Sequence, residues 1–384
     1  MGSEDEKKYK RRVHYSGKYP KKFEEKYKEH NPEKYQDIAQ HVIAKGSTPA
    51  GMHISIMVNE ILDFLQIKPG QRGLDCTLGY GGHTRKMLEC LQGEGCIYGL
   101  DVDPIESEKT VARLRDAGYG EDIFQFRLMN FADIDKMSEE AGKFDFVLAD
   151  LGVSSMQIDN PERGFSYKVD GPLDLRLDPS HGESAAERLR NISRDEFVGM
   201  LIENSDEPYA EEIADKVFDL MRKGKTINTT TELRQAIEDA LWKIPCESKD
   251  NKKINKSNDK TNNKSNNKIN NKTNNTTNNN EEKNKVIKKS CARVFQALRI
   301  DVNSEFEVLY AFLEKLPGIL KPGGRVAILT FHSGEDRLVK KAFKDLYKSG
   351  VFSEISADVL RPSAEECKLN PRSKSTKMRY AVKS

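Results

Sequence analysis

The chain has 384 residues, enough to bury at least one full hydrophobic core, and this length favours two domains. Its 63 basic and 61 acidic side chains leave a formal net charge of only +2, so the total charge does not indicate a nucleic-acid partner. The six cysteines show no paired spacing, which argues against a zinc site or a disulfide scaffold. The basic N-terminus lacks a following apolar run and no later segment could span a bilayer, so we expect a soluble, cytoplasmic protein.

The chain begins with a charged extension, residues 1–46, which has little apolar surface. From His53 onward, apolar residues at helical spacing predict a first helix that Pro69 and Gly70 end. Strands and helices then alternate up to residue 156, which predicts right-handed crossovers, a parallel sheet and an α/β fold. The predicted strands are 73–76, 96–100, 124–128 and 144–148, and the predicted helices are 84–91, a helix after Pro104, and 134–141.

The alternation stops after the fourth strand. Residues 157–247 contain loops and amphipathic helices without a convincing strand, which predicts an inserted, all-helical domain. Residues 248–285 are almost entirely Asn, Lys, Thr and Ser, so we expect this tract to be disordered. Residues 286–384 return to the sheet pattern. Here we predict helices at 292–302, 306–320 and 335–347, a turn at 321–324, and strands at 325–331 and 377–382.

A glycine-rich loop, from Gly79 to Gly82, follows the first predicted strand, and glycines let the backbone approach a ligand closely. Asp101 ends the second strand about twenty residues later, where an acidic side chain accepts hydrogen bonds from ribose hydroxyls. This spacing suits both NAD and S-adenosylmethionine. A dinucleotide fingerprint would place its third glycine at position 84, which is Thr84, so S-adenosylmethionine is the better ligand.

Acidic residues end three of the predicted strands, namely Asp75, Asp101 and Asp150. Three unpaired acids at the ligand edge of a sheet would be costly, so they favour a polar ligand with amine and hydroxyl donors. Phe131 follows the third strand, where it could contact an adenine ring or pack in the core. Without these acids, the glycine loop could equally be a simple tight turn.

Longer motifs extend this pattern through the chain: DCTLGYGGHT, LDVDP, NF, DLGVSSMQID, RGFSY, DGPLDLRLD, ARVFQALRIDVNSE, LKPGGRVAILTFHSGEDRLVK and NPRSKSTKMR. On these motifs the chain resembles the RsmH (MraW) family of S-adenosylmethionine-dependent methyltransferases. The resemblance covers about residues 53–383, interrupted by the Asn/Lys tract. It implies N4-methylation of a cytidine in the decoding region of 16S ribosomal RNA, with the small ribosomal subunit as partner.

The resemblance also implies a fold, a Rossmann-like class I methyltransferase sheet with a helical, substrate-recognising domain inserted after the fourth strand. Residues 47–156 and 286–384 would form the two parts of the sheet domain. The family's cofactor contacts fall on Gly81, Gly82, His83, Asp101, Phe131, Asp150 and Gln157.

Methyl transfer from a sulfonium is an in-line displacement that needs alignment and no metal. The lone pair of the cytosine N4 is delocalised into the ring, so an acceptor for the N4 hydrogens should promote attack. We predict that Asp150 or the hydroxyls of Ser154 and Ser155 orient this amine, while Phe165 or Tyr167 stacks on the base. Asp150 could instead only bind the cofactor, and the two serines could merely cap a helix or turn.

Contacts with RNA are expected from Arg163 and Arg176. His332 is a candidate either for a proton-accepting base or for a contact with an RNA phosphate. His332 could also be an ordinary histidine at a strand end. Further basic clusters are Arg188 and Arg190, Arg293 and Arg299, and residues 372–379.

Three stretches depart from the family pattern: Gly334 replaces a leucine, Ser290-Cys291 stands in place of Pro-Ala-Thr, and Ser205 to Tyr209 in place of a Tyr-Gly-Glu pattern. A diverged relative that methylates another RNA or a protein therefore stays open, as does a non-catalytic ribosome-assembly factor that binds RNA. The sequence also leaves a homodimer open.

Overall fold

The computed structural model describes residues 55–242, 244 and 271–384, without the side chains of 271–279. The charged extension predicted at 1–46 lies outside these residues, as does the part of the Asn/Lys tract up to residue 270. Within the described ranges, no helix combines the length and the apolar character that crossing a membrane requires.

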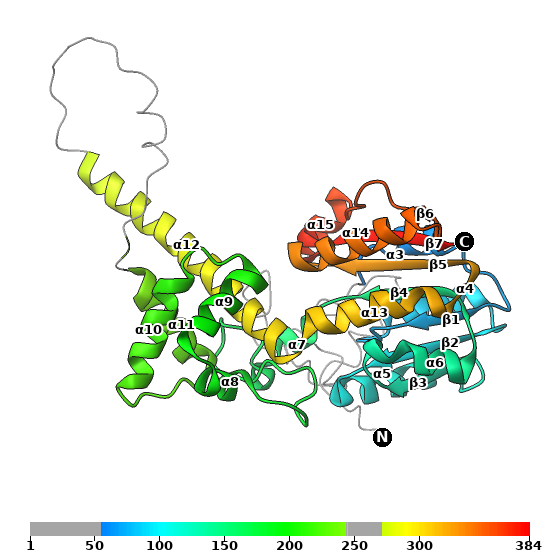
Figure 1. The fold of residues 1–384 in the computed structure, drawn as a ribbon, viewed down its shortest axis with the longest axis horizontal. Coiled ribbons are helices and arrows are strands. Elements are labelled where there is room, and N and C mark those ends of the chain that lie inside the picture. Colours follow the sequence, from blue (N-terminus) through cyan, green and yellow to red (C-terminus); the bar gives the residue numbers. More distant parts are fainter. Residues whose placement is uncertain (1–54, 243, 245–270) are drawn as a thin grey trace, which may run out of the picture. The chain divides into compact units, whose positions relative to one another are not determined.

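A seven-stranded sheet forms the centre of the fold (Figure 1), with the strand order β3-β2-β1-β4-β5-β7-β6. Pairing is parallel from β3 to β5, as the alternation predicted, whereas β7 is antiparallel to both of its neighbours. The alternation made no prediction for this edge. Here the chain crosses over through a helix to β6 and then runs back between β5 and β6 as β7. The strands are β1 Arg72–Asp75, β2 Cys96–Asp101, β3 Phe124–Leu128, β4 Phe144–Asp150, β5 Leu320–Thr330, β6 Phe352–Ile355 and β7 Lys377–Lys383.

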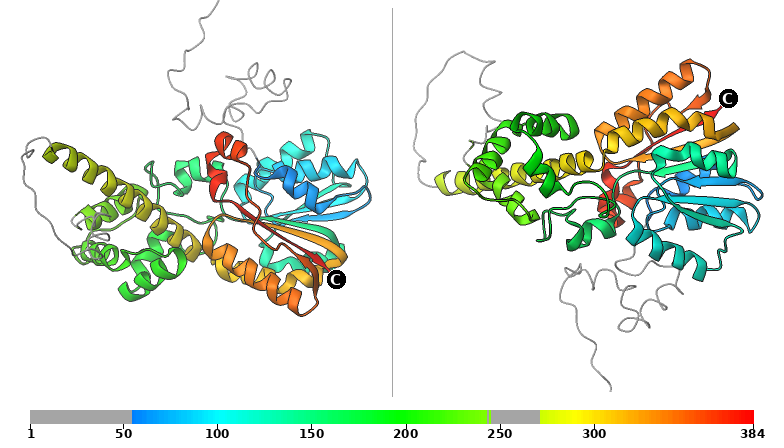
Figure 2. Two further views of the ribbon diagram at one scale, coloured as in Figure 1. Left: turned by 90° about the horizontal axis from the view of Figure 1, so that it is seen from above. Right: turned by 60° about the horizontal axis from the view of Figure 1, so that its bottom comes forward.

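Helices cover both faces of the sheet, as the two views in Figure 2 show. One face packs against α3 (Val58–Leu65), α4 (Gly82–Leu91) and α5 (Pro104–Asp116), and the other against α6 (Ile134–Ala141), α13 (Glu305–Ile319) and α14 (Ser333–Lys348). From Phe146 to Ala149 the side chains of β4 alternate between the two cores, so that Phe146 and Leu148 face α3 and α4 while Val147 and Ala149 face α13. Burial on both faces explains why the stretch from Phe146 to Ala149 is continuously apolar.

Near the C-terminus the structure differs from the sequence prediction in two ways. The turn predicted at 321–324 lies inside β5, where the pairing with β4 jumps from Leu320 opposite Phe144 to Arg325 opposite Phe146. The residues between these two pairs form an irregularity in the pairing, and β5 continues on both sides of it. The prediction also lacked β6 and the short helices α15 (Ala364–Leu369) and η6 (Pro371–Ser375), which are too polar or too short to show a clear period.

The predicted helical insertion is present after β4 and has a hydrophobic core of its own. Its helices are α8 Ala185–Asn191, α9 Arg194–Ser205, α10 Ala210–Arg222, α11 Thr230–Trp242 and α12 Asn271–Val302. Two predicted boundaries change. Residues 271–285 belong to α12 and are helical, and the stretch of α12 from Ile287 to Leu298 packs into the insertion and not into the sheet domain. Once this apolar segment forms helix, adding further turns toward the N-terminus costs little, because propagation is easier than nucleation.

Candidate functional site

The loop between β1 and α4 needs its glycines for conformation and for space. Gly81 precedes the first turn of α4 with φ +78°, in the left-handed region that favours glycine. A Cβ on Gly82 would lie 2.0 Å from the Ser55 hydroxyl oxygen. Around Gly79, by contrast, a Cβ would meet only the Thr77 carbonyl oxygen, at 3.8 Å, so there is room above this part of the loop.

Asp75, at the end of β1, connects three elements of the site. Its carboxylate accepts hydrogen bonds from the Thr84 hydroxyl in α4 (2.5 Å) and from the backbone amide of Thr77 (3.1 Å). The Thr77 hydroxyl oxygen in turn accepts the backbone N–H of Asp150 at 2.7 Å. Because Asp75 is fully buried, its pKa is raised above the ordinary value. Its contacts are all internal, so Asp75 holds the glycine loop against the end of β4.

Asp101 lies where the sequence predicted, at the end of β2 beside the glycine loop. One of its carboxylate oxygens accepts the backbone N–H of Gly79 (2.8 Å) and the other accepts that of Asp103 (2.9 Å). Burial raises the pKa of Asp101 to about 6, against the lowering effect of these two hydrogen bonds. Each oxygen retains a second lone pair for a ligand hydroxyl.

Asp150 ends β4 and brings the predicted residue His83 into the same site. The ring of His83 is buried, with Nε2 2.9 Å from the Ile56 carbonyl oxygen and Nδ1 3.5 Å from Asp150 Oδ2. The other oxygen, Asp150 Oδ1, is buried without a hydrogen-bond partner among the described residues. Burial raises the pKa of Asp150 to about 6, and the charges of Asp75 and Glu335 add to this while His83 opposes it. A buried acceptor without a donor is costly, so Oδ1 is suited to a ligand donor.

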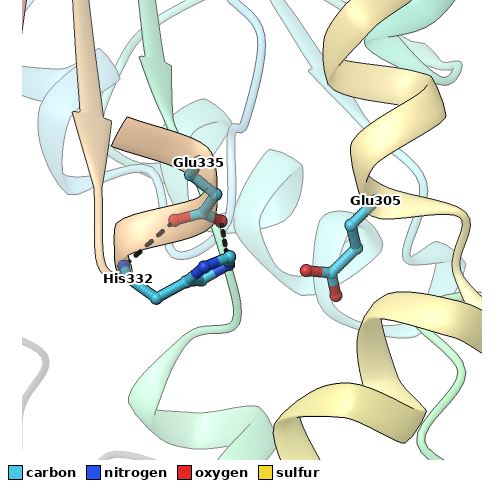
Figure 3. A group of neighbouring side chains, drawn as sticks. All are labelled: Glu305, His332 and Glu335. Carbon is cyan, nitrogen blue, oxygen red and sulfur yellow. Dashed lines mark hydrogen bonds and ion pairs between the residues drawn. The ribbon is translucent and has the colours of Figure 1, made fainter. Parts of the chain in front are cut away.

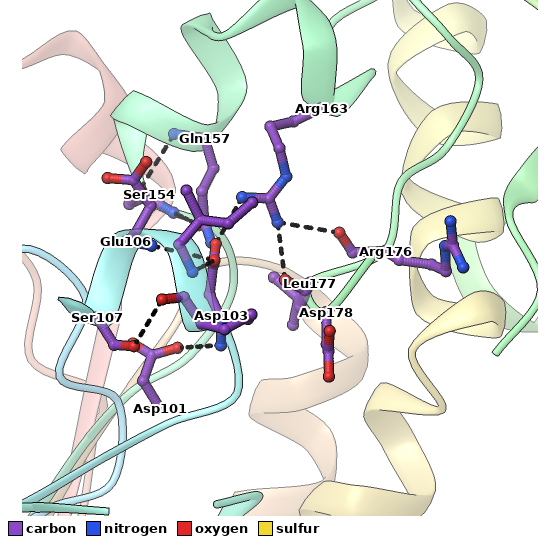
Figure 4. A network of polar contacts seen from close by, with 12 residues as sticks. Asp101, Asp103, Glu106, Ser107, Ser154, Gln157, Arg163, Arg176, Leu177 and Asp178 are labelled. Atoms are coloured by element: carbon purple, nitrogen blue, oxygen red, sulfur yellow. Dashed lines mark hydrogen bonds and ion pairs between the residues drawn. The ribbon is translucent and has the colours of Figure 1, made fainter. Parts of the chain in front are cut away.

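Gln157 and Arg163 converge on a residue that the sequence prediction did not name, Asp103 (Figure 4). Asp103 Oδ1 caps the N-terminus of α5, while Oδ2 accepts hydrogen bonds from Gln157 Nε2 and Arg163 Nη1, each at 2.7 Å. Arg163 also donates to the backbone carbonyls of Arg176 (3.2 Å) and Leu177 (2.7 Å). All three side chains of this Asp103 network are buried. An aspartate directly before Pro104 is a typical N-cap signal, and that signal could have identified Asp103.

The two predicted serines lie at the start of the short helix α7 (Ser155–Asp159). Ser154 caps this helix: its Oγ accepts the Gln157 backbone N–H, and the Gln157 side chain accepts the Ser154 N–H. The structure thus shows the capping that was one of the two alternatives for Ser154. Ser155 follows, and its carbonyl accepts a hydrogen bond from Arg372 at 3.2 Å. A catalytic role of either hydroxyl stays a prediction.

Four other predicted residues make side-chain contacts with residues other than Asp75, Asp101 and Asp150. Phe165 is buried in the core of the helical insertion, and Tyr167 packs edge-to-face on Phe295 in the same core. Phe165 therefore offers no open ring for base stacking, whereas Tyr167 is only partly buried, and stacking of either ring on a base stays a prediction. Arg176 forms a bidentate ion pair with Asp174, in which Nε donates to Oδ1 at 2.8 Å and Nη2 donates to Oδ2 at 2.7 Å. Phe131, in the 3-10 helix η2 (Phe131–Asp133), packs edge-to-face on Phe312 of α13 and is only partly buried.

His332 lies between β5 and α14, at the same edge of the sheet. It groups with two carboxylates that were not predicted as site residues, Glu335 and Glu305, and Figure 3 shows the three side chains facing one another. Glu335 was visible in the sequence only as part of the Ser333-Gly-Glu-Asp336 motif. The position of Glu335 in the sequence does not indicate that the start of α13 brings Glu305 to the same place.

Ion pairs distinguish most basic residues of the predicted clusters from those of helix α14. Most of the arginines in the predicted clusters are paired with acids: Arg163 with Asp103, Arg176 with Asp174, Arg188 with Glu196 and Asp301, Arg293 with Glu207, Arg299 with Glu305, Arg372 with Asp159, and Arg379 with Asp336. Helix α14 instead exposes a row of basic side chains at helical spacing, for which the described part of the chain provides no ion pair. This α14 basic row consists of Arg337, Lys340, Lys341, Lys344 and Lys348.

These features together fit S-adenosylmethionine, which offers an ammonium group and ribose hydroxyls as donors. Asp101 can accept from the hydroxyls, and the space above Gly79 leaves room for a ligand, while Asp150 Oδ1 is a buried acceptor for one further donor of the cofactor or of the substrate. All of these groups lie at the carboxyl ends of β1, β2 and β4, where open α/β sheets bind ligands. Fold and site together define a Rossmann-like class I methyltransferase.

Comparison with known proteins places the chain more narrowly. A profile of the MraW methylase family matches residues 50–384, and the chain belongs to this family. A protein of Agathobacter rectalis named "Ribosomal RNA small subunit methyltransferase H 1" is 64% identical over 380 residues, which is 99% of each chain. A protein of Alkaliphilus metalliredigens named "Ribosomal RNA small subunit methyltransferase H 2" is 54% identical over 379 residues, again 99% of each chain. The corresponding "methyltransferase H" of Thioalkalivibrio sulfidiphilus is 33% identical over 352 residues, covering 87% of this chain and 98% of the relative.

Proposed function

We propose that this protein transfers the methyl group of S-adenosylmethionine to the exocyclic N4 of a cytidine in the decoding region of 16S ribosomal RNA. The observation that carries the proposal is the unpaired, buried Oδ1 of Asp150 at the ligand edge of a methyltransferase sheet. Membership of the MraW methylase family and relatives named for small-subunit ribosomal RNA support the substrate. The cytidine and its N4 are what the resemblance of the motifs to the RsmH family implies.

In this proposal the residues of the chain bind the cofactor, orient the target amine and exclude water. S-adenosylmethionine, when bound, supplies an electrophilic methyl group. Asp101 accepts the ribose hydroxyls, and the glycine loop allows close approach of the backbone. Asp150 Oδ1 accepts an N4 hydrogen of the cytosine, which localises the nitrogen lone pair toward the methyl carbon. The Asp103 network fixes the loop that follows Asp150, so that this carboxylate keeps its position.

The direct test supplies radiolabelled S-adenosylmethionine and small ribosomal subunits from cells that lack this gene. We expect label in 16S ribosomal RNA, recovered as N4-methylcytidine after digestion. Label in another nucleoside or in protein would establish a different substrate. Measured cofactor binding without any transfer would favour the non-catalytic assembly factor instead.

The α14 basic row is the surface that we propose for the RNA backbone, because its charges are exposed and begin one turn from His332. Replacing Lys340, Lys341 and Lys344 together with glutamine should weaken RNA binding. The slope of log affinity against log salt should also fall, by about one for each phosphate that the variant no longer neutralises. Titrations of an RNA fragment at several salt concentrations measure this slope.

A matched control replaces three exposed lysines of α4, α5 and α6, each of which pairs with an acid on its own helix or at its start: Lys86, Lys109 and Lys136. Equal loss of affinity in both triple variants would show that α14 contributes only general charge.

A further inference from the structure

The group of His332, Glu335 and Glu305 forms a second polar cluster at the ligand edge, beyond the carboxylates already described (Figure 3). One potential ligand atom from each residue lies within 4.8 Å of the others. Three separate segments bring them there: the start of α13, the link from β5 to α14, and the first turn of α14. The three residues of this cluster are spread over about thirty positions of the sequence, so their grouping needs a structural or a chemical explanation.

The ring of His332 is the least satisfied member of this cluster. Its side chain is only 10% exposed, and neither ring nitrogen makes a hydrogen bond to a described residue. Nε2 lies 3.3 Å from Glu335 Oε1, an ion-pair distance, whereas Nδ1 has no comparable partner among the described residues. Buried polar atoms normally have a partner, so Nδ1 is placed for a polar group that the protein itself does not provide.

Glu335 is fixed to orient this ring. Its Oε2 accepts the backbone N–H of Phe331 at 2.8 Å, which leaves Oε1 directed at His332 Nε2. Burial alone would raise the pKa of Glu335, but the interactions with His332 and the charge of Arg299 outweigh it and lower the pKa. An ionised Glu335 favours the tautomer with its proton on Nε2, which leaves a lone pair on Nδ1.

The cluster also lies close to Asp150. Asp150 pairs in the sheet with Leu329, three residues before His332, and the charge of Glu335 contributes to the raised pKa of Asp150. A substrate amine hydrogen-bonded to Asp150 would therefore be near a histidine that an acid orients. A carboxylate that orients a histidine through one ring nitrogen, leaving the other to take a proton, is a recurrent arrangement in catalysis.

We propose that His332 Nδ1 accepts the proton that the target amine loses on methylation, and that Glu335 is the positioning residue for His332. The inference rests on the proposed function. The N4–methyl bond forms as the sulfur–methyl bond breaks, and sulfur keeps the electron pair of that bond. The surplus N4 proton moves to Nδ1, and the positive charge of the sulfonium passes to the imidazolium, next to Glu335.

The same three residues could instead hold a metal ion, but Arg299 argues against this. Both oxygens of Glu305 are engaged by the Arg299 guanidinium, at 2.7 and 2.9 Å. A cation bound to Glu305 would have to compete with this pair and lie beside its positive charge. The cluster therefore suits a proton better than a divalent ion.

The test compares the variants His332→Asn and Glu335→Gln with Glu354→Gln, a matched control on an exposed position of β6. We expect kcat for the RNA to fall about 10²- to 10⁴-fold in His332→Asn. In Glu335→Gln we expect a fall of about 10- to 100-fold, the range for residues that orient a functional histidine. KM for the RNA and the calorimetric affinity for S-adenosylmethionine should not change, and Glu354→Gln should match the wild type.

Long-range ¹H–¹⁵N spectra of histidine-labelled protein, without cofactor, provide a readout independent of activity. The His332 signals, identified by their loss in His332→Asn, should show the Nε2–H tautomer in the wild type and a mixture in Glu335→Gln. Unchanged kcat and unchanged signals in Glu335→Gln would overturn the inference, as would activity lost in EDTA and restored by Zn²⁺ or Mn²⁺. A wild type that methylates no RNA would refute the proposed function itself, whereas an active wild type with unaffected variants would refute only this inference.

Discussion

Replacing Arg163 with methionine is expected to lower the free energy of unfolding by about 3–5 kcal/mol, the usual cost of removing one partner of a buried ion pair. Asp103 would keep its hydrogen bonds from Gln157 and from the first turn of α5 but would lose the guanidinium that balances its charge. The backbone carbonyls of Arg176 and Leu177 would lose donors as well. Urea denaturation followed by circular dichroism measures the change, provided that the m-value stays constant.

Arg190→Met is the matched control, because Arg190 is exposed and its side chain donates a hydrogen bond to the exposed Asn228. We expect a change within about 0.5 kcal/mol there. Adding Asp103→Asn to Arg163→Met should restore part of the lost stability, since no unpaired charge would then be buried. Equal stability of Arg163→Met and Arg190→Met would contradict the interpretation that this pair holds the loop after β4.

The sheet was predictable because its signals are local. In β4, the apolar run from Phe146 to Ala149 and the acid that follows it indicated both a strand buried on two faces and a residue at the ligand edge. The helical insertion was visible as a loss of alternation. Residue roles at the glycine loop followed from turn chemistry, since Gly81 has the positive φ that such a loop requires.

The roles of long side chains were less predictable, because they depend on partners distant in sequence. Arg163 looked like an RNA contact, yet Asp103, sixty residues earlier, holds its guanidinium in the interior. Phe165 looked like a stacking ring, yet it belongs to the core of the insertion. Conversely, the lysines of α14 drew no attention in the sequence, because only the fold shows that no acid of the described residues pairs with them. Periodicity predicts which face of an element is buried, but not which charges find a partner.

Replacing Asp150 with asparagine should lower kcat by about 10- to 100-fold, corresponding to one charge-assisted hydrogen bond of about 1.5–3 kcal/mol. The buried position raises the pKa of Asp150 to about 6, so its carboxyl is largely protonated below that pH and ionised above it. Only the ionised form has both oxygens free to accept the amine hydrogen. For the wild type, kcat at saturating S-adenosylmethionine should therefore fall by about tenfold per pH unit below pH 6.

Asp101→Asn separates catalysis from cofactor binding, because Asp101 has a pKa raised to the same value of about 6 by burial but lies at the ribose position. This variant should bind S-adenosylmethionine about 10- to 100-fold more weakly, with kcat at saturation little changed. The acid limb of kcat should persist in Asp101→Asn and shift or disappear in Asp150→Asn. If Asp150→Asn instead weakened cofactor binding and left kcat at saturation intact, Asp150 would be a cofactor ligand alone. The amine would then have to be oriented by another acceptor, and the His332–Glu335 pair is the one that the same edge of the sheet provides.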